Sequence, residues 1–574
     1  MTDVTNRQVA DFLKEFGVLL ELNGDNPFRV RAHANAARTV EALEVEVEAL
    51  VAQETLTDAR GIGKGLAELI AEFVRTGTAI AYQELRAATP SGLLDILRIQ
   101  GLGPKKVGAI RQQLGIDSLD GLEQACTSGD LSQVSGFGKK TQENILKGIE
   151  TLRKYQGQHL LDVATETCTA LCASLREHPQ LLRLSPAGAL RRRLELVERI
   201  DLVASTEHPA AIADQFANHP AVSEVSLRAE DRVVVRLEDG LQAHLHLVPD
   251  NRFAAALHHL TGSEEYAIQI RERAQEFGFD LDATGLLKDA VPLPCAEERD
   301  LFAALDLPCI PPELREGRGE VEAAAQDALP RLIKADDIRG MLHVHSTYSD
   351  GVASLEEMAL AVRERGYAYL GMADHSRSAF YASGLQEEAV RRQHDEIDAL
   401  NERLDDFRIF KGIESDILAD GSLDYDDPLL ESFDFIVISI HSRFGMDAEE
   451  MTRRIVRAIE HPASSILGHL TGRLLLEREG YSLDVDAVLE AAARHRVAVE
   501  INAHPRRLDI DWRHLRRASD LGVRIAVNTD AHRISGFDHL QYGIDVARKG
   551  WLRPDDVINA QDTESIAAHF RNDG

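Results

Sequence analysis

Histidine and acidic residues stand at or just beyond the C-terminal ends of seven apolar runs in the last part of this chain of 574 residues. Imidazole and carboxylate together suit Zn²⁺, Mn²⁺ or Fe²⁺, and burying so many polar groups costs on the order of several kcal/mol unless they are paired or bound to metal. The pattern therefore predicts a cluster of divalent metals, and with it an enzyme. The runs with their polar ends are residues 341–345, 369–375, 409–414, 435–441, 466–469, 497–502 and 524–532.

The elements that position these side chains are expected to be buried parallel strands, because their Val, Ile and Leu residues are nearly continuous. In a (β/α) barrel the C-terminal ends of the strands meet on one face, where the chemistry gathers. His343 and His345 alternate along the first strand, so both imidazoles lie on one side of it. Asp350 follows in a Ser-Asp-Gly turn that can fold back over the strand end, and Glu414 is a candidate bridging carboxylate.

Length and composition limit the remaining possibilities. The length predicts about three or four domains, and an apolar content of 44% suffices for a packed core in each. No apolar stretch approaches the ~18 to 20 residues of a membrane span, the polar start is no secretory signal, and five scattered cysteines lack a CxxC pair, so we expect a cytoplasmic protein. The net charge of −31 excludes general electrostatic binding of nucleic acid, so any such contact must be local.

Three polar breaks between the helices expected over residues 1–150 share one form, in which two glycines flank an apolar residue and lysine follows. Glycine lets the backbone approach a ligand closely, and the next helix offers free N–H groups and a positive dipole end. One Gly-x-Gly also suits an ordinary turn, but three of them with lysine predict binding to DNA phosphates. The candidate residues are Gly61, Gly63 and Lys64, then Gly101, Gly103 and Lys105, and then Gly136, Gly138 and Lys139.

Motifs along the whole chain, namely residues 26–31, the helix-hairpin-helix breaks, residues 261–263, residues 311–320 and the metal-rich barrel, point to one family. In this order they resemble the bacterial family X DNA polymerases that carry a C-terminal polymerase and histidinol phosphatase (PHP) domain. The resemblance implies a multidomain fold. Its parts are an α-helical helix-hairpin-helix N-terminal domain at 1–150, an α+β nucleotidyltransferase-like palm at 151–250, a thumb at 251–315, a linker at 316–337 and a C-terminal distorted (β/α)7 PHP barrel at 338–574.

The same resemblance implies which barrel side chains bind two or three divalent ions, Zn²⁺, Mn²⁺ or Fe²⁺. The nine implied ligands are His343, His345, Asp350, His375, Glu414, His441, His469, Asp530 and His532. Asp374 is expected to orient an imidazole from outside the ligand set. Arg377, Arg443, Arg473 and Arg506 follow strand ends, where they either hold a substrate phosphate by forked hydrogen bonds or form surface salt bridges.

The palm departs from the family pattern at its metal site. Relatives hold two Mg²⁺ ions with three aspartates, whereas this chain has Arg199, Asp201 and His244 at those positions. Arg199 and Asp201 face the same side of a strand, so a guanidinium stands where Mg²⁺ should bind, and Mg²⁺ takes imidazole poorly. The turn signal Asp239-Gly240 predicts that a two-strand hairpin persists as a scaffold. We therefore expect no Mg²⁺ at the palm, and polymerase activity that is weak or absent.

Leu69 stands where related enzymes carry the Schiff-base lysine of their lyase reaction, and leucine cannot form an imine. The favoured function is a bacterial DNA-repair protein that acts as a metal-dependent 3′-5′ exonuclease, with cleavage at abasic sites as an extension. It would bind gapped, nicked or 3′-recessed DNA through backbone contacts, without a membrane and as a monomer. The alternatives are a gap-filling DNA polymerase, a small-molecule phosphoesterase and a non-enzymatic DNA-binding scaffold.

Overall fold

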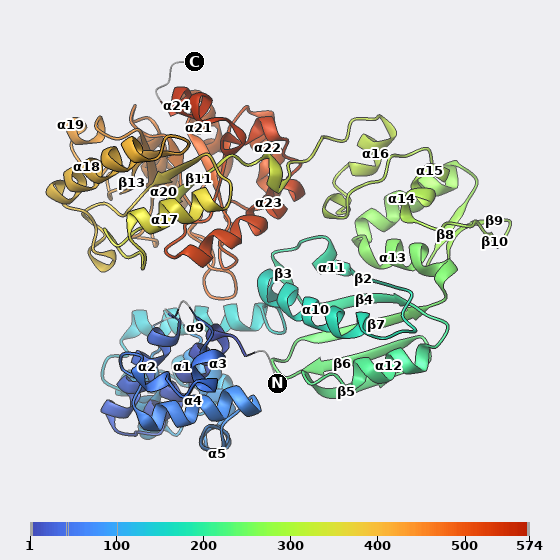
Figure 1. The fold of residues 1–574 in the computed structure, drawn as a ribbon, viewed down its shortest axis with the longest axis horizontal. Helices are drawn as coiled ribbons and strands as arrows, with labels where there is room; N and C mark the ends of the chain where they lie inside the picture. Colours follow the sequence, from blue (N-terminus) through green and yellow to red (C-terminus); the bar gives the residue numbers. More distant parts are fainter. Residues whose placement is uncertain (1–3, 42, 44, 100, 571–574) are drawn as a thin grey trace. The chain divides into compact units, whose positions relative to one another are not determined.

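The computed structural model describes residues 4–41, 43, 45–99 and 101–570, and it divides into a unit of residues 1–156 and a unit of residues 157–574. The first unit consists of helices, whereas the second contains sheets with their helices (Figure 1). Among the described residues, no helix is both long and apolar enough to cross a lipid bilayer.

The first unit packs its helices around two apolar cores. Leu13 of α1 and Ile70 of α4 lie in one core, and Ile110 of α7 and Ile149 of α9 lie in the other. Each helix buries one face, as its apolar spacing requires. The helices are α1 (Asn6–Leu22), α2 (Pro27–Glu41), α3 (Val47–Ala52), α4 (Lys64–Thr76), α5 (Ile80–Ala88), α6 (Ser91–Leu97), α7 (Pro104–Leu114), α8 (Leu119–Ser128) and α9 (Lys139–Lys154).

The three glycine pairs precede α4, α7 and α9 with one repeated geometry. The first glycine of each pair has a φ between +86° and +91°, which residues with a side chain rarely adopt. The second glycine is the N-cap of the following helix, and its φ between −82° and −65° is open to any residue. The first glycine is therefore required by the turn, whereas the turn does not require the second.

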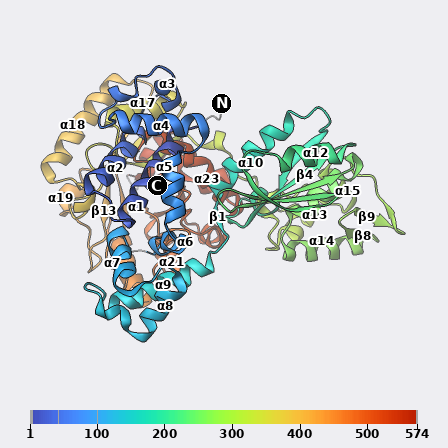
Figure 2. The same cartoon turned by 90° about the horizontal axis from the view of Figure 1, so that it is seen from below.

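The segment predicted as the palm has a sheet of five strands in the order β2-β4-β7-β6-β5, and its antiparallel β6–β7 pair is the hairpin that the turn signal predicted. Helices α10 and α12 cover one face, and α13 covers the other (Figure 2). Ile200 packs on the side of α10 and α12, so its neighbour Asp201 faces the side of α13, as does Val203. The elements are β1 (His159–Leu160), α10 (Leu161–Arg176), β2 (Arg183–Ala187), α11 (Gly188–Arg191), β3 (Leu196–Val197), β4 (Arg199–Ser205), α12 (Pro209–Ala217), β5 (Val222–Arg228), β6 (Arg232–Leu237), β7 (Gln242–Val248) and α13 (Phe253–Thr261).

The segment that follows the palm has a separate small core around a buried arginine. Arg315 is fully buried, and it donates to a carboxylate oxygen of Glu298 at 2.6 Å and to the carbonyl of Ile310 at 3.0 Å. The carboxylate of Glu298 compensates a charge that would otherwise be costly to bury. The elements are α14 (Glu264–Glu276), β8 (Asp280–Asp282), β9 (Gly285–Lys288), β10 (Val291–Pro292), α15 (Glu298–Ala304) and α16 (Glu320–Ala325).

The last segment is a barrel of seven parallel strands in sequence order, which confirms the predicted fold. A bridge between Val344 and Ala531 brings its two edges together, so the barrel is nearly closed. Its strands are β11 (Gly340–Val344), β12 (Tyr369–Met372), β13 (Arg408–Asp416), β14 (Phe435–Ser439), β15 (Ile466–Leu467), β16 (Ala498–Asn502) and β17 (Ile525–Asn528). Its helices are α17 (Leu355–Glu364), α18 (Glu387–Arg403), α19 (Asp427–Leu430), α20 (Ala448–Ile459), α21 (Val485–His495), α22 (Leu515–Asp520), α23 (Leu540–Lys549) and α24 (Thr563–Phe570).

Inside the barrel, side chains change from apolar at one end of the strands to polar at the other. Phe410, Gly412 and Glu414 share one side of β13, and a side chain at Gly412 would meet the ring of Phe435 at 2.3 Å. Phe570 of α24 stacks on Phe435 with ring centres 4.9 Å apart and closes the apolar end. The opposite, C-terminal end of the strands is left for the polar residues.

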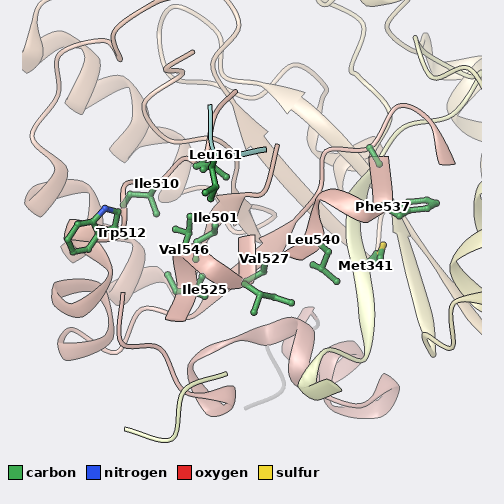
Figure 3. Close-up of a cluster of buried hydrophobic side chains, with 14 of the residues drawn as sticks. Leu161, Met341, Ile501, Ile510, Trp512, Ile525, Val527, Phe537, Leu540 and Val546 are labelled. Carbon is green, nitrogen blue, oxygen red and sulfur yellow. The ribbon is translucent and has the colours of Figure 1, made fainter. Parts of the chain in front are cut away.

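The outward faces of the strands pack against the surrounding helices. Ile501, Ile525 and Val527 lie in the same buried cluster as Leu540 and Val546 of α23 (Figure 3). A shift of one residue in strand register would turn these side chains inward and the polar ones outward. Packing on the outside of the barrel therefore fixes which side chains meet inside it.

Candidate metal centre

The polar strand ends bring the nine expected ligands into one cluster. Potential donor atoms form three overlapping groups, and within each group the atoms lie within 4.8 Å of one another. The groups are His343, His345 and Asp530; His345, Asp350, His375 and His532; and His375, Glu414 and His441. The ninth residue, His469, places Nε2 3.0 Å from Oε1 of Glu414.

Several of these donor atoms are buried without a hydrogen-bond partner. They include Nε2 of His343, Nε2 of His345, Nδ1 of His375 and Oε2 of Glu414. Nδ1 of His375 lies 2.8 Å from Oε2 of Glu414, yet the two atoms are not aligned as a hydrogen bond. Buried polar atoms are rarely left unsatisfied, so a set of lone pairs around a common space fits divalent metal ions.

Glu414 is the centre of this cluster. Its two carboxylate oxygens lie within 3.7 Å of imidazole nitrogens of His343, His345, His375, His441 and His469. Burial alone would raise the pKa of Glu414, but the surrounding imidazoles outweigh burial and hold that pKa well below its ordinary value. Glu414 is therefore ionised, and its two oxygens can serve two neighbouring ions.

The backbone is strained where ligands leave the strands. His343, His469 and Asp530 have φ values of +55°, +23° and +51°, although none of them is glycine. Such conformations cost about 1 to 3 kcal/mol each and persist where the surrounding packing enforces them. At β11 the strain coincides with a register shift between Met341 and Val344. The shift redirects His343 into the cluster.

Two carboxylates outside the expected ligand set orient imidazoles in it. Oε2 of Glu500 lies 2.5 Å from Nδ1 of His343, and Oδ1 of Asp416 lies 2.6 Å from Nδ1 of His441. Each contact fixes the ring and leaves Nε2 for the cluster. Neither residue was among the candidates predicted from the sequence. Asp416 follows Glu414 by two positions on the same strand, and that period of two was the available signal.

Asp374 has a different role from the expected one. It is fully buried and accepts hydrogen bonds from the backbone N–H of Ser346 at 2.8 Å, Oγ of Ser349 at 2.5 Å and Nε2 of Gln393 at 2.6 Å. Within the described residues, no imidazole forms a hydrogen bond with it. The expected contact with an imidazole was therefore wrong. Asp374 instead holds the loop that leads to Asp350.

The four arginines after strand ends differ in their surroundings. Arg473 donates from Nε to the carbonyl of Arg507 at 2.8 Å and from Nη1 to Asp511 at 2.7 Å, and its Nη2 bonds the carbonyl of Leu508. This guanidinium is used to hold a loop, so it is not free to bind phosphate. Exposed Arg506 pairs with Glu477, Arg377 pairs with Asp424, and Arg443 is exposed.

Comparison with known proteins matches four sequence families along the chain. Residues 4–79 match a helix-hairpin-helix domain, residues 93–151 a SAM-like helix-hairpin-helix tandem, residues 256–316 the DNA polymerase beta thumb, and residues 341–504 the PHP domain. A DNA polymerase/3′-5′ exonuclease PolX of Bacillus subtilis (strain 168) is 36% identical over 577 residues, covering 99% of this chain and all of the relative. The chain belongs to the bacterial family X DNA polymerases with a C-terminal PHP domain. The resemblance predicted from the sequence is thus confirmed.

More distant relatives match the PHP domain alone. A probable phosphatase of Thermoanaerobacter sp. (strain X514) is 27% identical over 229 residues, which are 38% of this chain and 88% of the relative. Another probable phosphatase, from Syntrophotalea carbinolica, is 26% identical over 231 residues. The barrel therefore occurs both fused to a family X polymerase and by itself.

In the segment predicted as the palm, nitrogen groups surround Asp201. Nε of Arg199 donates to both carboxylate oxygens of Asp201 at 3.1 Å. This contact confirms the prediction that the guanidinium of Arg199 lies beside Asp201. Nδ1 of His244 and Nε2 of His246 lie 3.7 and 3.6 Å from Asp201 Oδ1. Burial would raise the pKa of Asp201, but His246, Arg199 and His244 lower it. Asp201 is thus surrounded by a guanidinium and two imidazoles, and with His244 and His246 it forms a further group of potential metal donors, whose nitrogen atoms suit Mg²⁺ poorly.

Proposed function

We propose that this protein is a metal-dependent 3′-5′ exonuclease of DNA whose barrel performs all of its catalysis. The observation that supports this proposal is the contrast between its two possible metal sites. The barrel keeps nine clustered donor residues, three of them carboxylates, whereas the potential donor group at the palm keeps one carboxylate, Asp201, beside two imidazoles and paired with Arg199. The relative from Bacillus subtilis, which is named for both activities, supports hydrolysis of DNA as the activity that remains here.

Two or three ions of Zn²⁺, Mn²⁺ or Fe²⁺ would be held by the overlapping donor groups, which share His345 and His375. Such ions supply activated water and neutralise the charge that develops on a phosphodiester. Glu500 and Asp416 orient His343 and His441 for this task. Asp374 holds the loop that leads to Asp350.

The helix-hairpin-helix unit would deliver DNA to the barrel by binding the phosphate backbone of the DNA. A side chain added at Gly63, Gly103 or Gly138 would meet nothing within 4 Å, so these glycines are not required by packing inside the protein. Their absence of side chains instead leaves the helix N-termini open to a phosphate. Lys64 and Lys105 are exposed beside them. The substrates would be gapped, nicked or 3′-recessed duplexes, bound without sequence preference.

A nuclease assay on a 3′-recessed duplex, labelled at the 5′ end of the recessed strand, tests this function. With Mn²⁺ or Zn²⁺ the wild type should shorten the labelled strand stepwise, and His343→Ala should lower the rate by more than about 100-fold. His495→Ala removes an exposed histidine at the end of α21 and should leave the rate unchanged. Cleavage that survives in His343→Ala would remove the barrel as the active site.

The likeness to probable phosphatases keeps a small-molecule phosphoesterase as a second candidate. The two candidates differ in what competes for the site. If DNA is the substrate, single-stranded DNA should inhibit hydrolysis of bis(p-nitrophenyl) phosphate by the barrel. If DNA fails to inhibit while the small ester is cleaved rapidly, the phosphatase candidate replaces the exonuclease.

A further inference from the structure

Four large apolar side chains are exposed on the described part of the barrel, and all four lie in loops that also contain proposed ligands. Val352 follows Asp350, Ile534 follows His532, and Phe380 and Tyr381 are in the loop after His375. Exposed apolar groups that are scattered need no explanation, but a group confined to the surroundings of one site marks binding. We call these four residues the apolar rim.

The apolar rim lies where the metal cluster opens to solvent. The side chains of Asp350 and His532 are 34% and 32% exposed, whereas those of His343 and His345 are 0% exposed. The backbone N–H of Val352 donates to the carbonyl of His532 at 2.8 Å, which joins two of the rim loops. The exposed donors of the cluster therefore lie in the same loops as the rim residues Val352 and Ile534.

Tyr381 connects the apolar rim to the donor residues. Its ring centre lies 6.1 Å from that of His375 and 6.3 Å from that of His441, the two imidazoles that flank Glu414 in one donor group. Tyr381 is nevertheless 70% exposed, and the neighbouring Phe380 is 85% exposed. The Tyr381 ring thus lies beside two donor imidazoles while most of it is exposed, and Phe380 adds an exposed ring next to it in the chain.

Hydrogen bonds and close packing fix the loop that contains Phe380 and Tyr381. The N–H of Leu385 donates to the carbonyl of His375 at 2.8 Å, and Oγ of Ser378 donates to Asp416 at 2.8 Å. Ala382 is buried, and a side chain at Gly384 would come within 1.9 Å of the carbonyl of Ser376. The backbone of the loop is therefore fixed, and it holds the side chains of Phe380 and Tyr381 in solvent. The contacts that fix the loop do not involve these two rings.

The chemistry of the neighbouring site indicates what these rings bind. A phosphodiester at the donors carries a nucleobase on either side, and an aromatic ring stacks on the face of any base without reading its sequence. Only an unpaired base can leave its stack and turn a face to Phe380 or Tyr381. We propose that the apolar rim stacks on the unpaired base of the 3′-terminal nucleotide, and so makes frayed or mismatched 3′ ends the preferred substrates. This inference rests on the proposed exonuclease function.

Kinetics on matched and mismatched 3′ ends test the rim. The double variant Phe380→Ala/Tyr381→Ala should raise KM for a mismatched end about tenfold, with kcat within about twofold, and should abolish the preference for mismatched over matched ends. Tyr381→Phe should retain wild-type behaviour, because stacking does not need the hydroxyl. Phe277→Ala removes an exposed ring at the end of α14 and should change nothing.

Binding without cleavage gives an independent readout. In the His343→Ala background, a 3′-terminal 2-aminopurine should be quenched when it stacks on the rim, and the added double variant should restore its fluorescence. If His343→Ala abolishes cleavage but the double variant changes neither KM nor fluorescence, the rim proposal fails and the exonuclease stands. If cleavage survives in His343→Ala, the exonuclease itself fails.

Discussion

Glu500 and His343 form a fully buried pair whose carboxylate oxygen and Nδ1 atom are 2.5 Å apart. Nδ2 of Asn528 donates to the same oxygen at 2.8 Å, and the backbone N–H of His469 donates to the other oxygen at 3.1 Å. Glu500 therefore links three strands and sets the direction of the His343 ring. It acts on the cluster through a histidine, without being one of the expected ligands.

Replacing Glu500 with glutamine should weaken metal binding and lower kcat by about 10- to 100-fold, because an amide orients the His343 ring less firmly and supplies no negative charge. Metal content after dialysis and exonuclease rate should fall together. Glu460→Gln changes an exposed carboxylate at the end of α20 and serves as the control. Wild-type metal content and rate in Glu500→Gln would contradict this positioning role.

The palm should not add nucleotides. Because Arg199 and two histidines surround Asp201, primer extension with Mg²⁺ or Mn²⁺ should give no product with the wild type. Asp201→Asn keeps the shape of the side chain and should leave the exonuclease rate within about twofold, since it removes no barrel donor. Nucleotide addition by the wild type that disappears in Asp201→Asn would instead establish a working polymerase.

The second glycine of a hairpin should matter for DNA and not for folding. A side chain added at Gly103 would meet no atom of the protein, and the φ of −81° at this position is open to valine. The thermal unfolding midpoint of Gly103→Val should therefore stay near that of the wild type. Its side chain would, however, keep a phosphate from the N-terminus of α7. The Kd for nicked DNA should therefore rise about tenfold, equivalent to about 1.4 kcal/mol. Gly108→Ala, inside the same helix, is the matched control, and equal affinity in both variants would exclude phosphate binding here.

Acid should weaken the small core beside the palm through Glu298. Burial would raise the pKa of Glu298, but Arg191 and Arg315 lower it from 4.5 to about 2. Because the folded pKa is the lower one, this stabilisation is complete above about pH 4.5 and is lost as pH falls toward 2. Glu298→Gln should cost about 3 kcal/mol at pH 7, because it leaves buried Arg315 without its charged partner.

The effect is measured by urea unfolding at pH 7 and at pH 3. Unfolding is followed by tryptophan fluorescence, since Trp551 packs beside this core. The difference between Glu298→Gln and wild type should shrink at pH 3. Glu276→Gln alters an exposed ion pair and should differ little from wild type at either pH. A difference that stays constant between the two pH values would contradict the assigned titration.

The strands and most of the polar residues at their ends could be predicted from the order of residues alone. Continuous apolar runs predicted the seven strands, and the rule that chemistry gathers at their C-terminal ends predicted that His343, Glu414 and Asp530 would meet. The Arg199 and Asp201 pair was predicted for the same reason, since residues two apart on a strand share a side. These predictions succeeded because they depend on local periodicity.

The partners of those side chains depend on the folded arrangement of the barrel. Glu500 lies 157 positions from His343 along the chain, and only strand order and register bring them together. Asp374 accepts hydrogen bonds from two serines and a glutamine, and Arg473 donates to the backbone of a loop. Each side chain bonds the donor or acceptor that the fold brings nearest to it. The spacing of residues in the sequence determines on which face of a strand or helix a side chain lies. The closure of the barrel determines which other side chains that face contacts.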